Sequence, residues 1–209
     1  MAAYDLEEQE QLAELKAWWR QNGNLVLGTI TAVLLVFAAW NGWRWYQRSQ
    51  ALQAAALYEN LQTAARMSDG KAVRDAAGSI LEKYAGTAYA PLAALVSAKV
   101  NHQAGDLKTA RAQLQWVVDN TGLEEVRAIA RLRLATVLMD DSAYDEAMKM
   151  VEAKPAEAFE ALFASMRGDV LSAQNKRAEA RTAYRAAVEK ATDAAFRETL
   201  RLKLDALGE

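Results

Sequence analysis

The sequence contains no cysteine, one histidine and two prolines among its 209 residues. Without cysteine, neither a disulfide framework nor a thiolate metal site can form. A Ser-His-Asp site would depend on His102 alone, and no G-x-S-x-G, H-E-x-x-H, Walker or G-x-G-x-x-G string occurs. We therefore expect a protein that is not an enzyme and holds neither cofactor nor metal. We expect His102 to be exposed or to line a groove.

The larger part of the chain, residues 47–209, also has no net charge. Residues 47–209 carry 22 Lys and Arg against 22 Asp and Glu, once Lys16, Arg20, Arg44 and the five acids of the N-terminal tail are set aside. A nucleic-acid-binding domain needs a basic surface that neutralises phosphates. The balance predicts no nucleic-acid partner.

One segment, residues 25–46, is long and apolar enough to cross a lipid bilayer. No charged residue lies between Arg20 and Arg44, and about 20 apolar residues in a helix span the ~30 Å hydrocarbon core. Aromatic residues that favour the membrane interfaces flank the run: Trp18, Trp19, Trp40, Trp43, Trp45 and Tyr46. The sequence predicts one membrane-spanning helix at residues 23–46.

A buried core helix and a cleaved signal peptide are the alternatives for this segment. A core helix needs a polar outer face, and the run offers only Thr29, Thr31 and Asn41. A signal peptide opens with a basic region, whereas residues 1–22 form an acidic tail. We therefore expect an uncleaved signal anchor.

The charge rule for membrane orientation gives no answer. Lys and Arg close to the crossing set the orientation, and Lys16 with Arg20 on one side balance Arg44 with Arg48 on the other. Long soluble domains translocate largely regardless of their own charge.

One face of the apolar run carries small residues that would let a second membrane helix approach closely. They recur with Leu35 at spacings of four, three, four and three: Gly28, Ala32, Ala39 and Gly42. We expect Asn41 to lie near this face and to donate a hydrogen bond to the neighbouring helix. The alternative is that Gly and Ala are simply common in membrane helices and that Asn41 reaches interfacial water.

Residues 47–209 are rich in Ala and Leu and lack the alternating β-branched runs typical of strands, which predicts an all-α fold. Similar turns begin at Gly105, Ser142 and Asn175, at spacings of 37 and 33 residues. The same offsets connect three small residues where paired helices would approach closely: Ala98, Ala135 and Gly168. A period of this length indicates an α-solenoid.

These units resemble tetratricopeptide repeats, and Tyr144-Asp145-Glu146-Ala147 matches the start of that family's second helix. The third unit places Gly168, Leu171, Ala180, Tyr184 and Ala187 at the family's packing positions. An earlier turn at Asp69-Gly70 suggests a degenerate unit over residues 52–84, whose second helix should be irregular because Asp75 stands where a small residue belongs.

A polar-sided helix should close the array, because each hairpin leaves an apolar face for the next. Asp193 is predicted to cap that helix. Its apolar stripe would be Phe196, Leu200, Leu204 and Leu207. The residues expected to face water on the opposite side of this helix are Arg197, Arg201, Lys203 and Asp205.

The resemblance to tetratricopeptide repeats implies a concave groove lined by the first helix of each pair. The matching positions are Leu92, Leu95, Lys99, His102, Ile129, Leu132, Thr136, Met139, Leu162, Ser165, Asp169 and Ser172. Apolar and methionine side chains there could accept a segment of another protein. The alternative is that some of them belong to the core between helix pairs.

The whole chain resembles the YfgM family, described as an ancillary subunit of the bacterial Sec translocon. The resemblance is carried by the acidic tail, Lys16, Trp18-Trp19, Asn22-Gly23, Gly42-Trp43-Arg44-Trp45-Tyr46, Arg131-Leu132-Arg133-Leu134-Ala135 and Arg167-Gly168-Asp169. It implies a single-pass protein of the bacterial inner membrane with a cytoplasmic tail (residues 1–22) and a periplasmic repeat domain (residues 47–209). It also implies association with SecYEG and a membrane-anchored periplasmic chaperone, to which translocating polypeptides would be passed.

Two functions of different classes follow. The first is a membrane-tethered protein-protein interaction module of the Sec translocon. The alternative is a structural tetratricopeptide scaffold for another cell-envelope assembly, such as cell-wall or division machinery.

Overall fold

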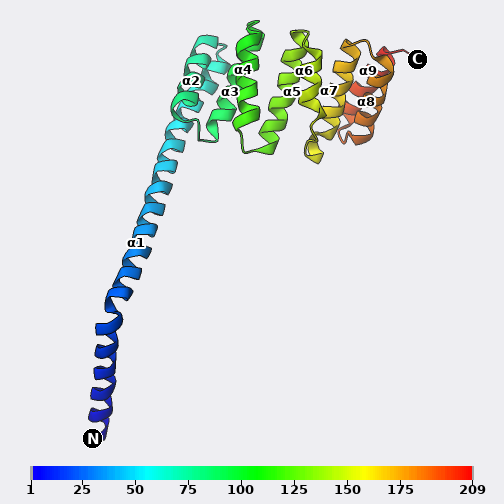
Figure 1. Cartoon of the computed structure of the whole chain (residues 1–209). Helices are drawn as coiled ribbons and strands as arrows, with labels where there is room; N and C mark the ends of the chain where they lie inside the picture. Colours follow the sequence, from blue (N-terminus) through cyan, green and yellow to red (C-terminus); the bar gives the residue numbers. More distant parts are fainter. Residues whose placement is uncertain (1, 209) are drawn as a thin grey trace. The chain divides into compact units, whose positions relative to one another are not determined.

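The computed structural model of the protein describes residues 2–208 and contains no strand in that range. The first helix, α1 (Ala2–Arg66), is continuous through the acidic tail and the apolar run. The chain divides into two units, Met1–Ser49 and Gln50–Glu209, and α1 contributes residues to both (Figure 1). The prediction of an all-α fold is confirmed.

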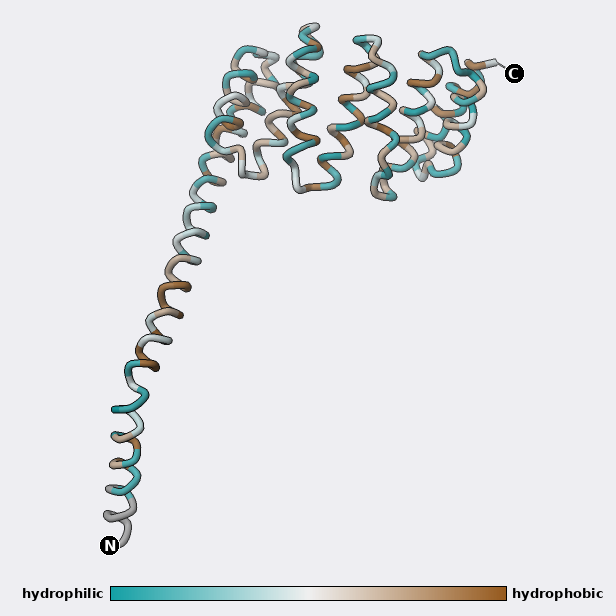
Figure 2. The backbone as a smooth tube through the Cα atoms, viewed as in Figure 1, coloured by the Kyte–Doolittle hydropathy of each residue, from teal (hydrophilic) through white to brown (hydrophobic). Residues whose placement is uncertain are grey.

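In the first unit, α1 turns apolar side chains outward on all sides. Among the described residues, it is the one helix long and apolar enough to cross a membrane, and the apolar turns are coloured brown in Figure 2. The polar groups inside the run bond to their own helix: Thr29 Oγ1 donates to the Leu25 carbonyl at 2.8 Å, and Asn41 Nδ2 donates to the Phe37 carbonyl at 3.0 Å. Internal bonding of this kind is what hydrocarbon requires.

The expectation that Asn41 lies near the small face is wrong. At about 100° per residue, Asn41 lies roughly 140° around the helix from the centre of the face formed by Gly28, Ala32, Ala39 and Gly42. One N–H of its side-chain amide bonds to the Phe37 carbonyl, and the second N–H and Oδ1 remain for other partners.

In the second unit, eight further α-helices follow α1 and pack against their neighbours in chain order (Figure 1). They are α2 (Gly70–Lys83), α3 (Tyr89–Gln103), α4 (Leu107–Asn120), α5 (Glu124–Asp140), α6 (Tyr144–Glu152), α7 (Glu160–Ala173), α8 (Arg177–Lys190) and α9 (Ala194–Ala206). A short 3₁₀ turn, η1 (Glu157–Phe159), precedes α7. Three buried apolar clusters run through these helices.

Four hairpin turns share one backbone geometry. Ser68, Gly105, Ser142 and Asn175 all have positive φ, between 58° and 78°. After each of them a backbone N–H bonds back to a carbonyl five residues earlier, for example Asp106 N to Asn101 O at 2.9 Å. A left-handed residue closed by such a bond ends a helix by satisfying its last carbonyls. The repeat therefore begins at the hairpin of α1 and α2.

This geometry corrects the alignment of the first hairpin. Ser68 precedes Gly105 by 37 residues, so the residue equivalent to Ala110 is Val73 rather than Asp75. Val73 is fully buried, and α2 is a regular helix. The expectation of an irregular second helix came from aligning Gly70, instead of Ser68, with Gly105.

In each hairpin, two buried positions 16 residues apart combine a large residue with a small one. The pairs are Leu61 with Ala77, Ala98 with Leu114, Ala135 with Val151, and Gly168 with Tyr184. At Gly168 an added Cβ would lie 2.5 Å from ring atoms of Tyr184. Glycine is therefore needed at that position because its partner is a tyrosine.

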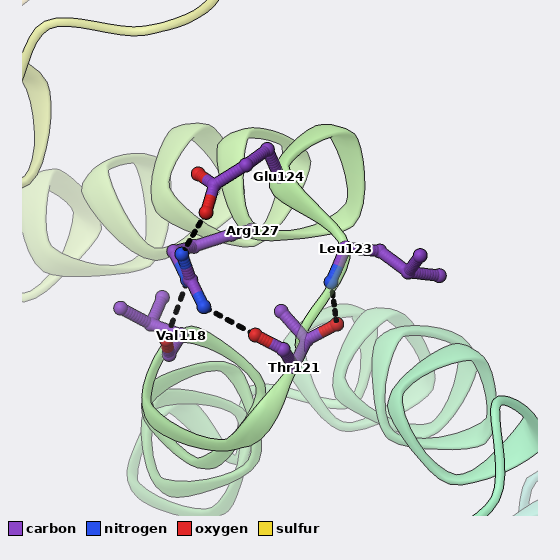
Figure 3. A network of polar contacts seen from close by, with 5 residues as sticks. All are labelled: Val118, Thr121, Leu123, Glu124 and Arg127. Carbon is purple, nitrogen blue, oxygen red and sulfur yellow. Dashed lines mark hydrogen bonds and ion pairs between the residues drawn. The ribbon is translucent and has the colours of Figure 1, made fainter.

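Arginines of the following helix close the ends of the preceding one. Arg127 on α5 bonds to the Thr121 carbonyl and, through Nε at 3.2 Å, to the Val118 carbonyl, and it pairs with Glu124 (Figure 3). Arg197 on α9 bonds to the Ala191 carbonyl in the same way. These carbonyls at the ends of α4 and α8 would otherwise lack partners.

The last helix confirms one expectation and overturns another. Asp193 caps α9, because its carboxylate accepts a hydrogen bond from the Phe196 N–H at 2.7 Å. Arg197 and Lys203, however, do not stand free in water. Arg197 turns toward the end of α8 and Lys203 toward α7.

Candidate peptide-binding groove

The first helices of the pairs, α3, α5 and α7, together with α9, form what we call the A-helix face. Contacts between α3 and α5 and between α5 and α7 make its helices neighbours. Two adjoining pockets open on it, and both lie toward the C-terminal halves of α3, α5 and α7.

The first of these, the basic pocket, has a volume of about 280 Å³. It is lined by Ala98, Lys99, His102, Leu114, Arg133, Thr136 and Val137. The second, the methionine pocket, has a volume of about 490 Å³. It is lined by Thr136, Met139, Asp140, Met166, Asp169, Ser172, Ala173, Tyr184 and Lys203.

Half of the predicted groove residues line these pockets. They are Lys99, His102, Thr136, Met139, Asp169 and Ser172. The others lie nearer the N-termini of their helices. Leu95 and Ser165 are buried, at 6% and 5% exposure, and are therefore not surface residues.

The remaining predicted positions divide between core and a separate cavity. Ile129 and Leu132 pack against the central buried cluster, and Leu92 is half-buried. Leu162 is 40% exposed and lines a cavity of about 880 Å³ with Phe196, at the loops that precede α7 and α9. The stripe predicted as one surface thus serves three different environments.

Ion pairs organise the methionine pocket. Lys203 Nζ donates to both carboxylate oxygens of Asp169, at 2.6 and 2.8 Å, and lies 5.6 Å from the centre of the Tyr184 ring. The Tyr184 hydroxyl donates to Asp169 Oδ1 at 2.7 Å. Burial, followed by this bond to a carboxylate, raises the pKa of Tyr184 above its ordinary value, so the hydroxyl keeps its proton at neutral pH.

A second pair joins two repeats at the boundary between the pockets. His102 Nε2 on α3 lies 2.5 Å from Asp140 Oδ2 on α5. His102 lines the basic pocket and Asp140 lines the methionine pocket. The contact with Asp140 holds the His102 ring at this boundary.

Several residues of these pockets escaped the sequence reasoning. Arg133 lies four residues after Ile129, off the predicted stripe, and reaches the basic pocket with its long side chain. Met166 lies on α7 but outside the predicted stripe. Tyr184 lies on α8 and Lys203 on α9, two helices for which no groove residue is predicted. The separation of 34 residues between Asp169 and Lys203, close to the repeat period, is the signal that could have found their pairing.

Within residues 2–208, no three His, Cys, Asp or Glu side chains converge as a metal site would require. The ionisable groups of the A-helix face instead pair with one another or point outward. This arrangement is suited to binding another molecule, because apolar and methionine side chains lie beside charged groups that are held in place by their partners.

In the first unit, the predicted small face is open. A Cβ added at Gly28 or Gly42 would meet no atom of the chain within 4 Å, whereas Gly23 already carries the Trp19 ring. Gly28 and Gly42 therefore have room for another helix.

A family profile described as a tetratricopeptide repeat-like domain matches residues 16–209. Three bacterial relatives are each named ancillary SecYEG translocon subunit. The Escherichia coli (strain K12) protein is 30% identical over 204 residues, with 96% of both chains covered. The Neisseria gonorrhoeae protein is 29% identical over 209 residues, covering 99% of this chain and 100% of the relative. The Haemophilus influenzae protein is 29% identical over 185 residues, covering 87% and 89%.

Among solved structures, MamA 41-end from Desulfovibrio magneticus RS-1 superposes with a TM-score of 0.55 at 18% identity. The match covers 74% of this chain and 89% of that one. At this identity, the likeness concerns the fold of the helical repeats alone.

Proposed function

This chain belongs to the tetratricopeptide repeat-like family and to the family of ancillary SecYEG translocon subunits, and from that premise we propose that it is a membrane-anchored protein-interaction module of the bacterial Sec translocon. The observation that supports the proposal is the length of the alignment with the Escherichia coli protein. It covers 96% of this chain and therefore includes the anchor as well as the repeats. Residues 1–22 would lie in the cytoplasm, residues 23–46 in the inner membrane, and residues 47–209 in the periplasm.

The anchor would supply the contact with the channel. Small residues along one helical face let two membrane helices approach closely, and Gly28 and Gly42 leave that face open. We assign Gly28, Ala32, Ala39 and Gly42 to this contact. Asn41 lies off this face, and the amide groups that it does not use within its own helix could bond to a neighbouring membrane helix.

The A-helix face would receive polypeptides. Met139 and Met166 line a pocket that opens on it, and methionine side chains adapt to segments of varied shape. A chain held near the exit of a channel in this way could be passed to a membrane-anchored periplasmic chaperone.

Site-specific photo-crosslinking in native membranes tests the proposal. A photoreactive residue at Ala39, on the small face, should give adducts with the subunits of the channel. The matched control is Phe37, which lies on the opposite side of the helix and is 65% exposed. It should give adducts at least several-fold weaker.

Two results would contradict the proposal. Equal yields from Ala39 and Phe37 would remove the small face as the contact. Adducts with cell-wall or division proteins in place of channel subunits would favour the alternative, a structural scaffold for another envelope assembly.

A further inference from the structure

The basic pocket contains positive charge that no described carboxylate neutralises. Lys99 on α3 and Arg133 on α5 are both exposed, and neither forms an ion pair within residues 2–208. Arg133 donates one hydrogen bond, from Nη1 to the Leu95 carbonyl at 3.3 Å, and its other N–H groups remain available. The two cations come from neighbouring helices and line the same pocket.

The adjoining methionine pocket differs in this respect. Asp169 forms an ion pair with Lys203 and accepts a hydrogen bond from Tyr184, and Asp140 is hydrogen-bonded to His102. Among the Lys and Arg side chains that line the two pockets, Lys203 forms an ion pair, whereas Lys99 and Arg133, both in the basic pocket, form none within the described part of the chain.

The rest of the basic pocket is apolar. Ala98, Leu114 and Val137 also line it, and all three are buried. A carboxylate placed between two cations beside such an apolar lining is partly shielded from water, which strengthens its charge-assisted hydrogen bonds. Charge complementarity thus favours an acidic group as the occupant.

The two pockets are contiguous, because Thr136 lines both. Neighbouring helices pack roughly 8–10 Å apart. At about 3.3 Å per residue, an extended chain covers that distance in about three residues. One segment could therefore occupy both pockets with side chains about three residues apart.

We propose that the A-helix face binds an extended segment of a partner polypeptide in which an acidic side chain, seated between Lys99 and Arg133, lies about three residues from an apolar side chain held by Met139 and Met166. This rests on the proposed function and deepens it, because it states what kind of segment an interaction module of this family would select.

Fluorescence anisotropy with full-length protein in detergent tests the selection. The probe is a labelled serine-rich peptide that carries one glutamate and, three residues away, one leucine, made in both orders. One matched peptide replaces the glutamate by glutamine, and another replaces the leucine by serine. We expect one order of the acidic peptide to bind about tenfold more tightly than its glutamine match, as for one charge-assisted hydrogen bond. The serine-for-leucine peptide should also bind more weakly.

Variants of the protein locate the effect. Lys99→Gln with Arg133→Gln should abolish the preference for glutamate. Lys71→Gln with Arg185→Gln is the matched control, since it removes the same charge from two exposed residues on α2 and α8 that line neither pocket, and it should keep the preference. Circular dichroism checks the folding of both. Added salt tests the same contact without a substitution. In the wild-type protein, the preference for glutamate over glutamine should shrink several-fold when salt screens the charges of Lys99 and Arg133.

The proposal is overturned if glutamate and glutamine peptides bind wild type equally, if neither binds, or if the preference survives the Lys99/Arg133 double variant. A preference that added salt does not reduce would also overturn it. Co-purification of the channel subunits with the same double variant separates this result from the proposed function, because the channel contact is assigned to the anchor. Loss of peptide selection with retained co-purification is the expected outcome. If the wild-type protein shows no preference for the glutamate peptide but still co-purifies with the channel subunits, the pocket assignment is wrong and the proposed function stands.

Discussion

The anchor and the repeat array are built from similar Ala- and Leu-rich helices, and they place their side chains in opposite ways. In the anchor, Val36 and Phe37 are 71% and 65% exposed. In the array, Leu134 and Phe163 are 1% and 0% exposed. Polar groups differ as well, because those of the apolar run bond to the preceding turn of their own helix, whereas the array also has polar bonds between helices. Outward apolar surface with internally satisfied polar groups is typical of a lipid environment.

The comparison teaches where each region is vulnerable. The array depends on shape complementarity between helices and on polar bonds that close helix ends. The anchor, a single uninterrupted helix with nothing packed on Gly28 or Gly42 within the described chain, depends on neither. The same kind of substitution should therefore have unequal effects in the two regions.

The largest difference is expected for glycine to alanine. Gly168→Ala places a Cβ 2.5 Å from the Tyr184 ring, an overpacking that should cost about 3 kcal/mol. The melting temperature of the array should fall by roughly 5–10 °C, followed by circular dichroism. Gly28→Ala in the anchor should leave it unchanged.

A second substitution tests the cause. Adding Tyr184→Leu to Gly168→Ala recreates the pair found at Ala98 and Leu114 and should recover most of the loss. If Gly168→Ala melts like the wild type, the large-to-small pairing does not limit the packing of the hairpins.

A smaller effect is expected at the end of α4. Arg127→Ala leaves the Val118 and Thr121 carbonyls without their arginine and should cost about 1–2 kcal/mol, discounted for partial exposure. Arg201→Ala is the control, since that arginine is exposed and pairs only with Glu198 on its own helix. Equal melting temperatures for the two variants would mean that the arginine contact does not stabilise the array.

The smallest effect is expected at the last cap. Asp193→Ala removes the acceptor of the Phe196 N–H and should cost about 1 kcal/mol. Asp205→Ala, at an exposed position near the end of α9, is the matched loss of one carboxylate and should have no effect. Hydrogen exchange of the Phe196 amide measures this hydrogen bond directly. If the amide stays protected from exchange in Asp193→Ala, the assignment of Asp193 as the cap is wrong.

Sequence reasoning succeeded where a local rule decides the structure. Asp193 as a cap and the small residues at Ala98, Ala135 and Gly168 follow from backbone groups and helix spacing that a sequence displays. It failed where a distant residue decides. Lys203 was assigned to solvent, because its partner Asp169 lies 34 residues away. Leu95 and Ser165 were assigned to a surface, because a repeat register does not reveal how deeply each helix sits.

The central claim is that lipid covers the outward apolar surface of residues 25–46, with the array on the periplasmic side. Since the chain contains no cysteine, single cysteines report accessibility without background. Gln11→Cys and Ala178→Cys both replace exposed residues, one on each side of the apolar run. In spheroplasts, a membrane-impermeant thiol reagent should label Ala178→Cys at once and Gln11→Cys only after lysis. Labelling of both before lysis, or of Gln11→Cys alone, would contradict the account.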